Sequence, residues 1–488
     1  MIKRTLVLAG SVIVLLSVIV VVRTLMHTPL EQKVPQQVEI ELDENLVAQH
    51  LSEAIQIATV THQNPSDRDQ QAFEDFISWV AATYPELHAT LSLQRLNDTL
   101  LYKWQGKDET LQPILLTGHY DVVPVIPGSE DNWQYPPFSG AVVDGVIWGR
   151  GALDDKSGVI GILEAANHLA KEGFEPMRTV YLSFGHDEEA GGSNGAALVA
   201  ETLKKERVQL AWSLDEGSFV FDKMIAGVDP LMAVINVAEK GSVTLQIVAR
   251  SSGGHSSMPP RQTAVGILAE AIIKLEKNPV PGGLEGLSLQ MFDTISRYMP
   301  FVPRVFFANR WLFAGVLDDQ LSAQGMTNAM LRTTTAPTML SASVKINVLP
   351  VEAIAAVNFR VHPRDSVEDV ISHVKRIVES DKVEVRLPAG SGRAASGVSD
   401  WNSKGYSVIA DSVRQVYGEI IISPGLMIAA SDSRHYAKVA DNSYRFNPLT
   451  VTSEDLTGFH GTNEKISADN LARGVRTYIQ IIRNGASE

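Results

Sequence analysis

The chain has 488 residues, 44% of them hydrophobic and 20% charged, so it is long enough for two or three domains and is not intrinsically disordered. Its 42 basic and 56 acidic residues give a formal net charge of −14, which argues against nucleic acid as a partner. The absence of cysteine excludes disulfides, thiolate nucleophiles, iron–sulfur clusters and cysteine-ligated zinc, so any metal must be held by His, Asp and Glu.

The first expected element is an uncharged, Val-, Leu- and Ile-rich run from Thr5 to Val22, which follows Lys3 and Arg4. As a helix this run reaches about 27 Å, close to the thickness of a bilayer's hydrocarbon core. We expect residues 1–28 to be an uncleaved membrane anchor, with the basic N-terminus cytoplasmic and the body exported. Arg23 beyond the run weakens the charge asymmetry, so a cleaved signal segment and a secreted protein form the alternative.

After residues 29–44, whose polarity predicts a stalk, short apolar runs alternate with helical patterns, which is typical of an α/β sheet. The expected strands are Ile114–Leu116, Val142–Ile147, Val180–Phe184, Leu210–Leu214 and, further along, Ala353–Arg360. Helices are predicted over Gly158–Lys171 and Ala468–Arg483, the second beginning after Ser467 as N-cap. We therefore expect an α/β fold with a mixed, mostly parallel sheet flanked by helices.

Polar side chains follow the first four of these strands, at the point where each strand ends. They are His119 and Asp121, then Asp154 and Asp155, then Asp187, Glu188 and Glu189, and finally Asp215 and Glu216. In open α/β sheets the ligand crevice lies beyond the carboxyl ends of the strands, so these groups are expected to meet there. So many acids in one place would repel one another without a cation, which indicates a metal site.

Taken singly, each group has an ordinary interpretation. His119 could be a hydrogen-bonded loop residue, and Asp154 and Asp155 could be charges at the start of a helix. Glu188 and Glu189 alone would most often be solvated surface. Their recurrence at four successive strand ends, between glycines that let the backbone approach a centre closely, favours the metal site.

The order of these motifs resembles a known family. The motifs are Gly-His119-Tyr-Asp121, Gly-Arg-Gly-Ala-Leu-Asp154-Asp155, Asp187-Glu188-Glu189, Asp215-Glu216-Gly217 and Phe459-His460-Gly461-Thr-Asn463-Glu464. Together they resemble the M20 metallopeptidases, the aminoacylase and carboxypeptidase group with two co-catalytic zinc ions. The likeness covers nearly everything after about residue 45. It is nearest to the subgroup of the yeast vacuolar Gly-X carboxypeptidase and the secreted N-acyl amino acid synthase/hydrolase.

The resemblance implies a ligand set for two metal ions. Asp154 would bridge the two ions, His119 and Asp215 would complete one site, and Glu189 and His460 would complete the other. Imidazole and carboxylate ligands suit zinc, with Co²⁺ or Mn²⁺ as substitutes, and a bridging carboxylate can hold two cations about 3.5–4 Å apart.

The resemblance also assigns roles around the metals. Glu188 would be the general base, taking the proton of the attacking water and passing it to the leaving amine. Asp121 would orient His119, and the peptide between Asp154 and Asp155 is expected to be cis.

The sequence pattern changes around Val243–Val248, and the Gly- and Ser-rich stretch Pro388–Gly397 is typical of a linker. By the resemblance, residues 238–389 would be an inserted α+β lid and dimerisation domain, which also implies a homodimer. The catalytic domain would then consist of residues 45–237 and 390–488.

Four further residues match motifs that face the substrate in the family. His255 would stabilise the tetrahedral oxyanion, often from the neighbouring subunit, although a turn histidine beside Pro259 is the simpler interpretation. Asn347 and Arg360 would grip the substrate carboxylate, which Arg can do through two hydrogen bonds, although Arg360 could equally be a strand-edge charge. Arg434 lies in another loop that resembles a substrate-facing one.

We therefore expect a dizinc-dependent hydrolase that cleaves the amide bond next to an amino acid with a free carboxylate. Its substrates would be short peptides such as Gly-X or N-acyl amino acids. One alternative is a non-catalytic binding or receptor protein on a peptidase scaffold, but all expected ligands and Glu188 are present. The other is a serine hydrolase using Ser193 of Gly191-Gly-Ser193-Asn-Gly195, but Ser193 lies nine residues beyond Phe184 rather than at the strand end.

Overall fold

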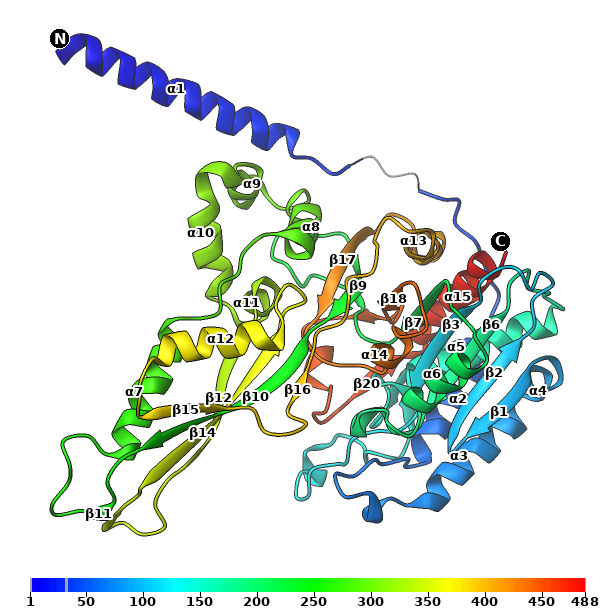
Figure 1. The fold of residues 1–488 in the computed structure, drawn as a ribbon. Helices are drawn as coiled ribbons and strands as arrows, with labels where there is room; N and C mark the ends of the chain where they lie inside the picture. Colours follow the sequence, from blue (N-terminus) through cyan, green and yellow to red (C-terminus); the bar gives the residue numbers. More distant parts are fainter. Residues whose placement is uncertain (1, 31–33, 488) are drawn as a thin grey trace. The chain divides into compact units, whose positions relative to one another are not determined.

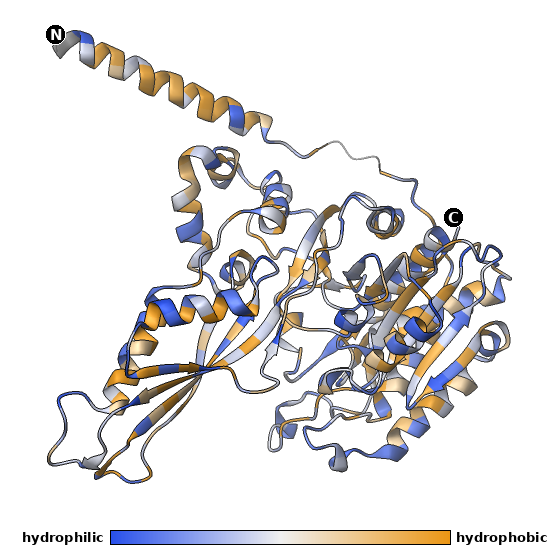
Figure 2. Ribbon diagram, viewed as in Figure 1, coloured by the Kyte–Doolittle hydropathy of each residue, from blue (hydrophilic) through white to orange (hydrophobic). Residues whose placement is uncertain are grey.

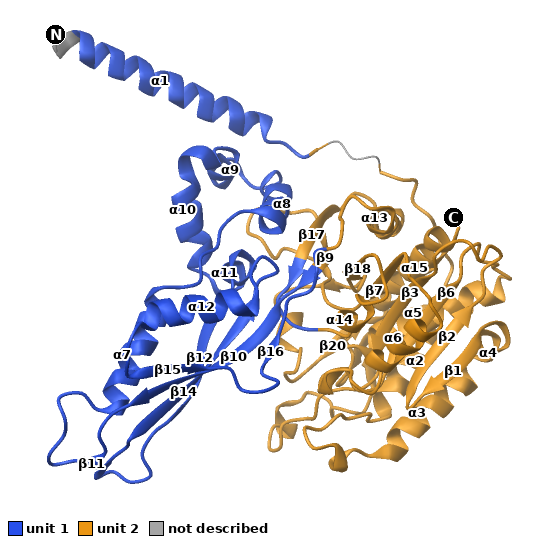
Figure 3. Cartoon of the chain, in the orientation of Figure 1, with its two compact units in different colours: residues 1–29, 238–398, 426–430 blue, residues 30–237, 399–425, 431–488 orange. Residues whose placement is uncertain are grey.

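The computed structural model describes residues 2–30 and 34–487, so residues 31–33 of the expected stalk lie outside the described residues. The chain divides into two compact units (Figure 3). Unit 1 comprises residues 1–29, 238–398 and 426–430. Unit 2 comprises residues 30–237, 399–425 and 431–488.

A ten-stranded sheet lies almost entirely within unit 2, in the order β1-β2-β6-β3-β7-β18-β9-β8-β19, with β17 paired to β9 (Figure 1). Its centre is parallel, because β3 pairs in parallel with β6 and β7, and β7 with β18, whereas β1 and β2 are antiparallel. The prediction of a mixed α/β sheet is confirmed. The strands are β1 (Ser92–Leu96), β2 (Thr99–Trp104), β3 (Ile114–His119), β6 (Val180–Gly185), β7 (Trp212–Asp215), β8 (Val220–Phe221), β9 (Met232–Glu239), β17 (Ile421–Met427), β18 (Ser443–Arg445) and β19 (Thr450–Val451).

Helices cover both faces of this sheet. The two faces can be told apart along β3, where successive side chains point to opposite sides. Leu115 packs on one face with Val199 of α6 and Tyr436 of α14. Ile114 points to the other face, where α15 approaches so closely that a Cβ at Gly485 would lie 2.9 Å from the Ile114 side chain. The helices of unit 2 are α2 (Glu44–Gln56), α3 (Gln70–Thr83), α4 (Pro85–Thr90), α5 (Lys156–Lys171), α6 (Ala196–Lys205), α13 (Lys404–Tyr417), α14 (Ser433–Tyr436) and α15 (Ala468–Ala486), with short 3₁₀ helices at Pro65–Asp67, Glu130–Asn132, Glu188–Ala190 and Asp455–Thr457.

The prediction of one buried strand over Val142–Ile147 is wrong. The segment forms a hairpin of β4 (Ala141–Val143) and β5 (Val146–Trp148), joined by Asp144 and Gly145 at φ of 50° and 75°. With β20 (Lys465–Ser467) the hairpin makes a separate three-stranded sheet. An Asp-Gly pair inside an apolar run is a hairpin signal, which the sequence prediction passed over.

Unit 1 is built on a sheet of order β12-β14-β10-β15, with β16 also paired to β10. The inward side chains of β10 and β14, such as Val243 and Phe359, are buried under α7 and α12. The strand predicted at Ala353–Arg360 is confirmed as part of β14, and part of the expected linker Pro388–Gly397 forms β16. The elements are β10 (Gly241–Arg250), β11 (Gly254–His255), α7 (Ala264–Lys277), α8 (Gly286–Ser296), α9 (Phe301–Ala308), α10 (Arg310–Ser322), α11 (Gly325–Leu331), β12 (Thr334–Ser341), β13 (Val348–Leu349), β14 (Glu352–Val361), α12 (Val367–Val378), β15 (Val383–Arg386) and β16 (Gly392–Arg393).

Unit 1 also contains α1 (Ile2–Met26). Within the described residues it is the one helix long and apolar enough to cross a membrane, judged by length and composition, over Arg4–Met26. A signal sequence would pass the same test.

The start of α5 is fixed by a buried lysine. Lys156 is fully buried, and its Nζ donates to the carbonyl oxygens of Ala54 (2.7 Å) and Ile57 (2.6 Å) at the end of α2. Burial lowers the pKa of Lys156 to about 7. The two bonds hold α2 against the first turn of the helix that follows Asp154 and Asp155.

We predict that Lys156→Met destabilises unit 2 by about 2–4 kcal/mol, because two buried carbonyl groups lose their donor. The matched control is Lys171→Met at the other end of α5, where the side chain is exposed. Thermal unfolding of both variants measures the effect. Equal melting temperatures for the two variants would contradict this role for Lys156.

Candidate metal centre

Residues from five places in the chain meet in unit 2. His119 is the last residue of β3, Glu188 and Glu189 open the 3₁₀ helix after β6, and Asp215 and Glu216 stand at the end of β7. Because these strands are parallel, their ends share one edge of the sheet. The loops that carry Asp154 and His460 are joined by the antiparallel pairing of β5 with β20.

Asp154 lies between two histidines. Its Oδ1 is 3.1 Å from His119 Nε2, and its Oδ2 is 3.1 Å from His460 Nε2. The peptide between Asp154 and Asp155 is cis, as expected. One carboxylate therefore presents an oxygen to each of two clusters, the geometry that a bridging ligand needs.

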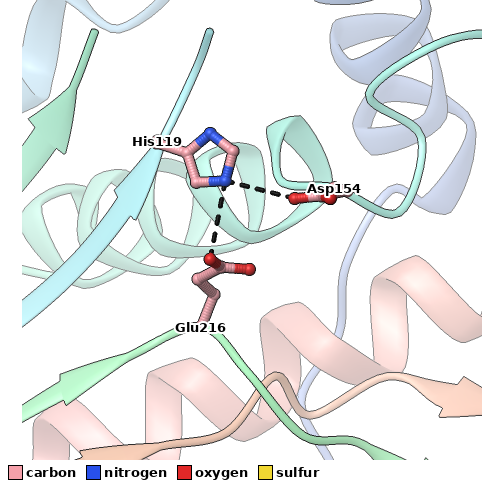
Figure 4. Close-up of side chains that lie close together, drawn as sticks. All are labelled: His119, Asp154 and Glu216. Atoms are coloured by element: carbon pink, nitrogen blue, oxygen red, sulfur yellow. Dashed lines mark hydrogen bonds and ion pairs between the residues drawn. The ribbon is translucent and has the colours of Figure 1, made fainter. Parts of the chain in front are cut away.

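The first cluster consists of His119, Asp154 and Glu216, whose candidate ligand atoms all lie within 4.8 Å of one another. His119 Nε2 points at both carboxylates and is 3.6 Å from Glu216 Oε1 (Figure 4). Asp215, which the sequence predicts as the ligand here, is buried next to this cluster, and its Oδ2 has no hydrogen-bond partner among the described residues. The structure thus adds Glu216 as a second candidate beside Asp215, whose role stays a prediction.

The second cluster consists of Asp154, Glu189 and His460. His460 Nε2 lies 3.4 Å from Glu189 Oε1. The His460 backbone has φ of 52°, a left-handed conformation that is uncommon for a residue other than glycine. The imidazole of His460 is more than half exposed (57%), whereas His119 is buried, so the second cluster is open to solvent on its His460 side.

Asp121 organises both sides of the site. Its carboxylate is buried and accepts hydrogen bonds from the backbone N–H groups of Glu188 and Glu189, each at 3.2 Å. The Asp121 carbonyl oxygen lies 2.9 Å from His119 Nδ1, and its Oδ1 lies 3.4 Å from the same nitrogen. Asp121 therefore positions the two glutamates as well as His119, which is more than the sequence predicts.

Burial changes the acidity of the clustered carboxyls. Desolvation raises the pKa of Glu188 well above its usual range, that of Asp215 to about 6 and that of Glu216 to about 7. Burial acts in the same direction on Asp154, but hydrogen bonds from His119 and His460 hold its pKa below the usual range.

The residues present fit a pair of divalent cations. The donor set is imidazole and carboxylate, which suits zinc in a site without cysteine. The buried, unpaired Oδ2 of Asp215 also needs a positive partner. Arg434 is the cation that pairs with Glu188, and its Nη1 is 3.9 Å away from Glu188 Oε1, too far for a hydrogen bond.

A buried clasp holds the two ligand loops together. Glu464 accepts hydrogen bonds from the backbone N–H groups of Gly151, Leu153 and Asp154, at 2.7–3.1 Å, and pairs with Arg150 Nη1 at 2.8 Å. Both side chains are at most 2% exposed. Glu464 stands four residues after His460, so it ties that ligand loop to the backbone of the bridging aspartate.

Sequence reasoning assigned no role to several residues here. Glu464 occurs in a recognised motif, but nothing in the sequence shows that it binds the backbone around Asp154. Asp155 accepts a hydrogen bond from Asn447 Nδ2 (2.8 Å) and is packed so closely that a Cβ at Gly158 would lie 2.4 Å from its Oδ1. The glycine after Asp-Asp-Lys-Ser was the available signal for this contact.

The remaining predicted residues are divided between the units. Arg434 lies beside Glu188 in unit 2. His255 and Asn347 lie next to each other in unit 1, where Ser256 N donates to the Asn347 carbonyl oxygen. Arg360 lies near the far end of β14, which spans about 26 Å between Glu352 and Arg360. The structure therefore does not bring Asn347 and Arg360 of one chain together.

The serine hydrolase alternative gains no geometric support. Ser193 is exposed, in a turn eight residues beyond the end of β6. Among the described residues, its hydroxyl makes no hydrogen bond to a histidine that could act as a base. A nucleophile elbow places its serine directly at the strand end.

Comparison with known proteins gives a consistent result. The sequence pattern described as "Peptidase family M20/M25/M40" matches residues 115–484. The chain is 38% identical to a probable carboxypeptidase S-like protein of Dictyostelium discoideum, over 90% of this chain and 85% of that protein. It is 37% identical to an N-fatty-acyl-amino acid synthase/hydrolase of Xenopus tropicalis, over 92% of this chain and 87% of that protein.

Solved structures share the fold. An M20 family metallo-carboxypeptidase of Sulfolobus solfataricus aligns with a TM-score of 0.63 and 17% identity, covering 91% of this chain and 99% of that one. Human carnosine dipeptidase 1 aligns with a TM-score of 0.61 and 18% identity, covering 91% and 96% of the two chains.

We predict that Glu464→Gln weakens metal binding by about 10–100-fold, because the neutral side chain loses its ion pair with Arg150 and loosens the Asp154 backbone. Metal content after dialysis against a graded chelator measures this. The matched control is Glu454→Gln, a substitution of an exposed glutamate ten residues earlier. Equal metal retention in the two variants would contradict the clasp.

We also predict that chelated protein becomes less stable as pH rises from about 4 to about 7. In the folded chain the pKa of Asp215 is raised to about 6 and that of Glu216 to about 7. The contribution of these groups to the free energy of unfolding is complete below the pKa values of the unfolded chain. It is lost as pH rises through the pKa values of the folded chain. The loss is on the order of a few kcal/mol. Thermal unfolding with chelator or with zinc measures it, since zinc binds the ionised carboxylates and offsets the loss. The double variant Asp215→Asn, Glu216→Gln should flatten the chelated curve, and an unchanged curve would refute this origin.

Proposed function

Because the chain belongs to peptidase family M20/M25/M40, we propose that it hydrolyses the amide bond next to an amino acid with a free carboxylate. It is a hydrolytic enzyme of a metal-dependent family. We further propose two zinc ions as its cofactors, with Co²⁺ or Mn²⁺ able to replace them. The ligands proposed are His119, Asp154, Glu189, Asp215 and His460.

One observation carries the proposal. The two oxygens of Asp154 each lie 3.1 Å from the Nε2 atom of a different histidine, at the edge of the sheet where Glu188 stands. A carboxylate held in this way matches a bridge between two cations. The neighbouring buried acids are stabilised when the cations are bound, which explains why so many of them share one place.

The chain's own residues then perform the proton transfer. Bound metal ions would lower the pKa of water and polarise the scissile carbonyl. Glu188, whose backbone N–H is held by Asp121, takes the proton of the attacking water at its carboxylate and delivers it to the leaving amine. Glu188 stands next to the proposed ligand Glu189 at the start of the same 3₁₀ helix, which places its carboxylate beside the water that bound cations would hold.

The names of the relatives support two substrate classes. One is a probable carboxypeptidase S-like protein, and another is an N-fatty-acyl-amino acid synthase/hydrolase. Both names fit a substrate made of an amide to an amino acid with a free carboxylate. We propose short peptides such as Gly-X and N-acyl amino acids as the substrates.

The inserted segment, which we propose as a lid and dimerisation domain, supports a homodimer. Asn347 and Arg360 lie too far apart in one chain to grip the same carboxylate, but residues of two subunits could share the task. β12 is an edge strand whose Met339 and Leu340 are 71% and 69% exposed, an apolar edge of the kind that pairs with another chain. His255 is exposed and remains the proposed oxyanion-stabilising residue.

The N-terminal helix supports a membrane location. We propose that α1 anchors the protein with its N-terminus in the cytoplasm and the catalytic body exported, and that a secreted form arises if the segment is cleaved.

We predict that Glu188→Gln lowers kcat by at least about 10³-fold while metal content is unchanged, because the general base is lost and the ligands remain. The control Glu201→Gln alters an exposed glutamate on α6 and should retain full activity. Near-normal kcat in Glu188→Gln would disprove the mechanism.

We predict that His460→Ala reduces metal content and activity together, because this variant removes a proposed ligand. Activity should be measured with zinc on a panel of Gly-X dipeptides and N-fatty-acyl amino acids, each with its carboxyl-amidated counterpart. Hydrolysis of the free acids alone is expected. Hydrolysis that persists after chelation would instead support Ser193.

A further inference from the structure

The C-terminal end of α1 is bonded to the helical insertion α8–α10 of unit 1. Asn309 Nδ2, at the end of α9, donates to the Val20 carbonyl oxygen (3.2 Å) and the Thr24 hydroxyl (3.1 Å). Arg23 Nε donates to the Ala308 carbonyl oxygen (3.3 Å). His27 Nε2 lies 2.9 Å from the Ser296 hydroxyl of α8. The corner between α9 and α10 is therefore fixed at the level of the last two turns of the membrane helix.

The apolar stretch Arg4–Met26 of α1 includes the residues that the corner contacts. Its 23 residues reach about 34 Å, against a hydrocarbon core of about 30 Å, so α1 can cross the core with its last turns at the membrane surface. In those turns Val22 and Leu25 are 47% and 58% exposed, whereas Thr24 is buried by the contact. Because the corner is bonded to these same turns, it lies where α1 leaves the core, which is the depth of an interfacial helix.

The corner has the side chains that such a depth requires. Five large apolar residues are 43–67% exposed there, namely Phe301, Val302, Trp311, Leu312 and Val316. These residues lie on α9 and on the first two turns of α10. The first part of α10 is coloured hydrophobic and its end hydrophilic (Figure 2). That end carries Asp318 and Asp319, so the polarity of α10 changes along its axis.

The charges around the corner favour a lipid surface over a second protein copy. Arg297, Arg304 and Arg310 flank the apolar residues along the chain, and cations in such a position favour headgroup phosphates. Arg310 and Arg297 are already held in place by Asp293. Trp311 supplies the indole that is enriched at membrane interfaces. The Thr24 hydroxyl and the Asn309 Nδ2 amide, where the corner meets α1, are both hydrogen-bonded.

We propose that the corner of α9 and α10, with Phe301, Val302, Trp311, Leu312 and Val316, inserts into the outer leaflet of the membrane that α1 crosses. The proposal rests on the proposed anchoring by α1. The occupant of this apolar face is lipid, and the contact fixes unit 1 against the membrane by a second attachment beside the anchor.

Trp311 provides a direct test, since it is the one tryptophan within the unit 1 segments of the sequence. The full chain is reconstituted into phosphatidylcholine vesicles, with or without bromine on the upper acyl carbons, which quenches tryptophan at contact distance. The fluorescence of Trp311 is obtained as the difference in emission between the native chain and the Trp311→Phe variant. We expect brominated lipid to quench most of this difference in emission.

The matched control moves the indole to another exposed site of the same unit. Val344 is 98% exposed, in the loop between β12 and β13. In the double variant Trp311→Phe, Val344→Trp, the added fluorescence should be the same with brominated and ordinary lipid. Quenching at both positions would mean non-specific adsorption and would overturn the proposal.

Intact mass of the reconstituted protein separates failure of the anchor from failure of the contact. If α1 is retained and the Trp311 difference is unquenched, the contact is refuted while the anchor stands. Trp311 could also be shielded from the aqueous quencher iodide and yet not be quenched by brominated lipid. That result would assign the apolar face to a second copy of the chain and would also refute the lipid contact. Loss of α1 would refute both proposals, and the hydrolase activity is tested independently of either.

Discussion

The concentration of negative charge at the carboxyl edge of the large sheet is the constraint on which the rest of the site depends. Parallel strands bring His119, Glu188, Glu189 and Asp215 to one edge whether or not the charges there balance. Burial then makes ionisation costly, as the raised pKa values of Glu188 and Glu216 show. Two divalent cations at Asp154 would remove this cost, so that the same charges that oppose folding become the source of metal affinity.

The surroundings of Asp154 can be understood as support for that carboxylate. Glu464 holds the backbone on which Asp154 stands, Asp121 holds the glutamates opposite, and Lys156 fixes the helix that follows. In each of these contacts a buried charged side chain is hydrogen-bonded to backbone groups. Such a contact is rigid, because few alternative arrangements satisfy both partners. Rigidity of this kind keeps the ligand atoms near their places when a metal ion is exchanged.

Much of the fold and the site could be predicted from the sequence, because strand ends and glycine spacing are local patterns. β3, β6 and the gathering of acids at the strand ends belong to this class, whereas the individual ligand roles come from the family resemblance and stay predictions. The hairpin at Val142–Ile147 was missed since an apolar run alone does not distinguish one strand from two, and the Asp-Gly turn decides. Glu216 could not be separated from Asp215 by sequence, because which of two adjacent acids turns inward depends on how β7 ends. The bonds of Glu464 to the Asp154 loop cross more than 300 residues of chain and leave no local signal.

The pairing of β20 with β5 has a consequence for the order in which the protein is made. Synthesis proceeds from the N-terminus, so His119, Asp154, Glu189 and Asp215 emerge before residues 238–398 of unit 1, and His460 emerges after them. A nascent chain that has completed β5 cannot yet form the three-stranded sheet, and it lacks both the second histidine and the Glu464 clasp. In the proposed ligand set, therefore, a chain that has not yet reached His460 cannot hold both cations, and the hydrolytic centre is assembled only after that residue has been made.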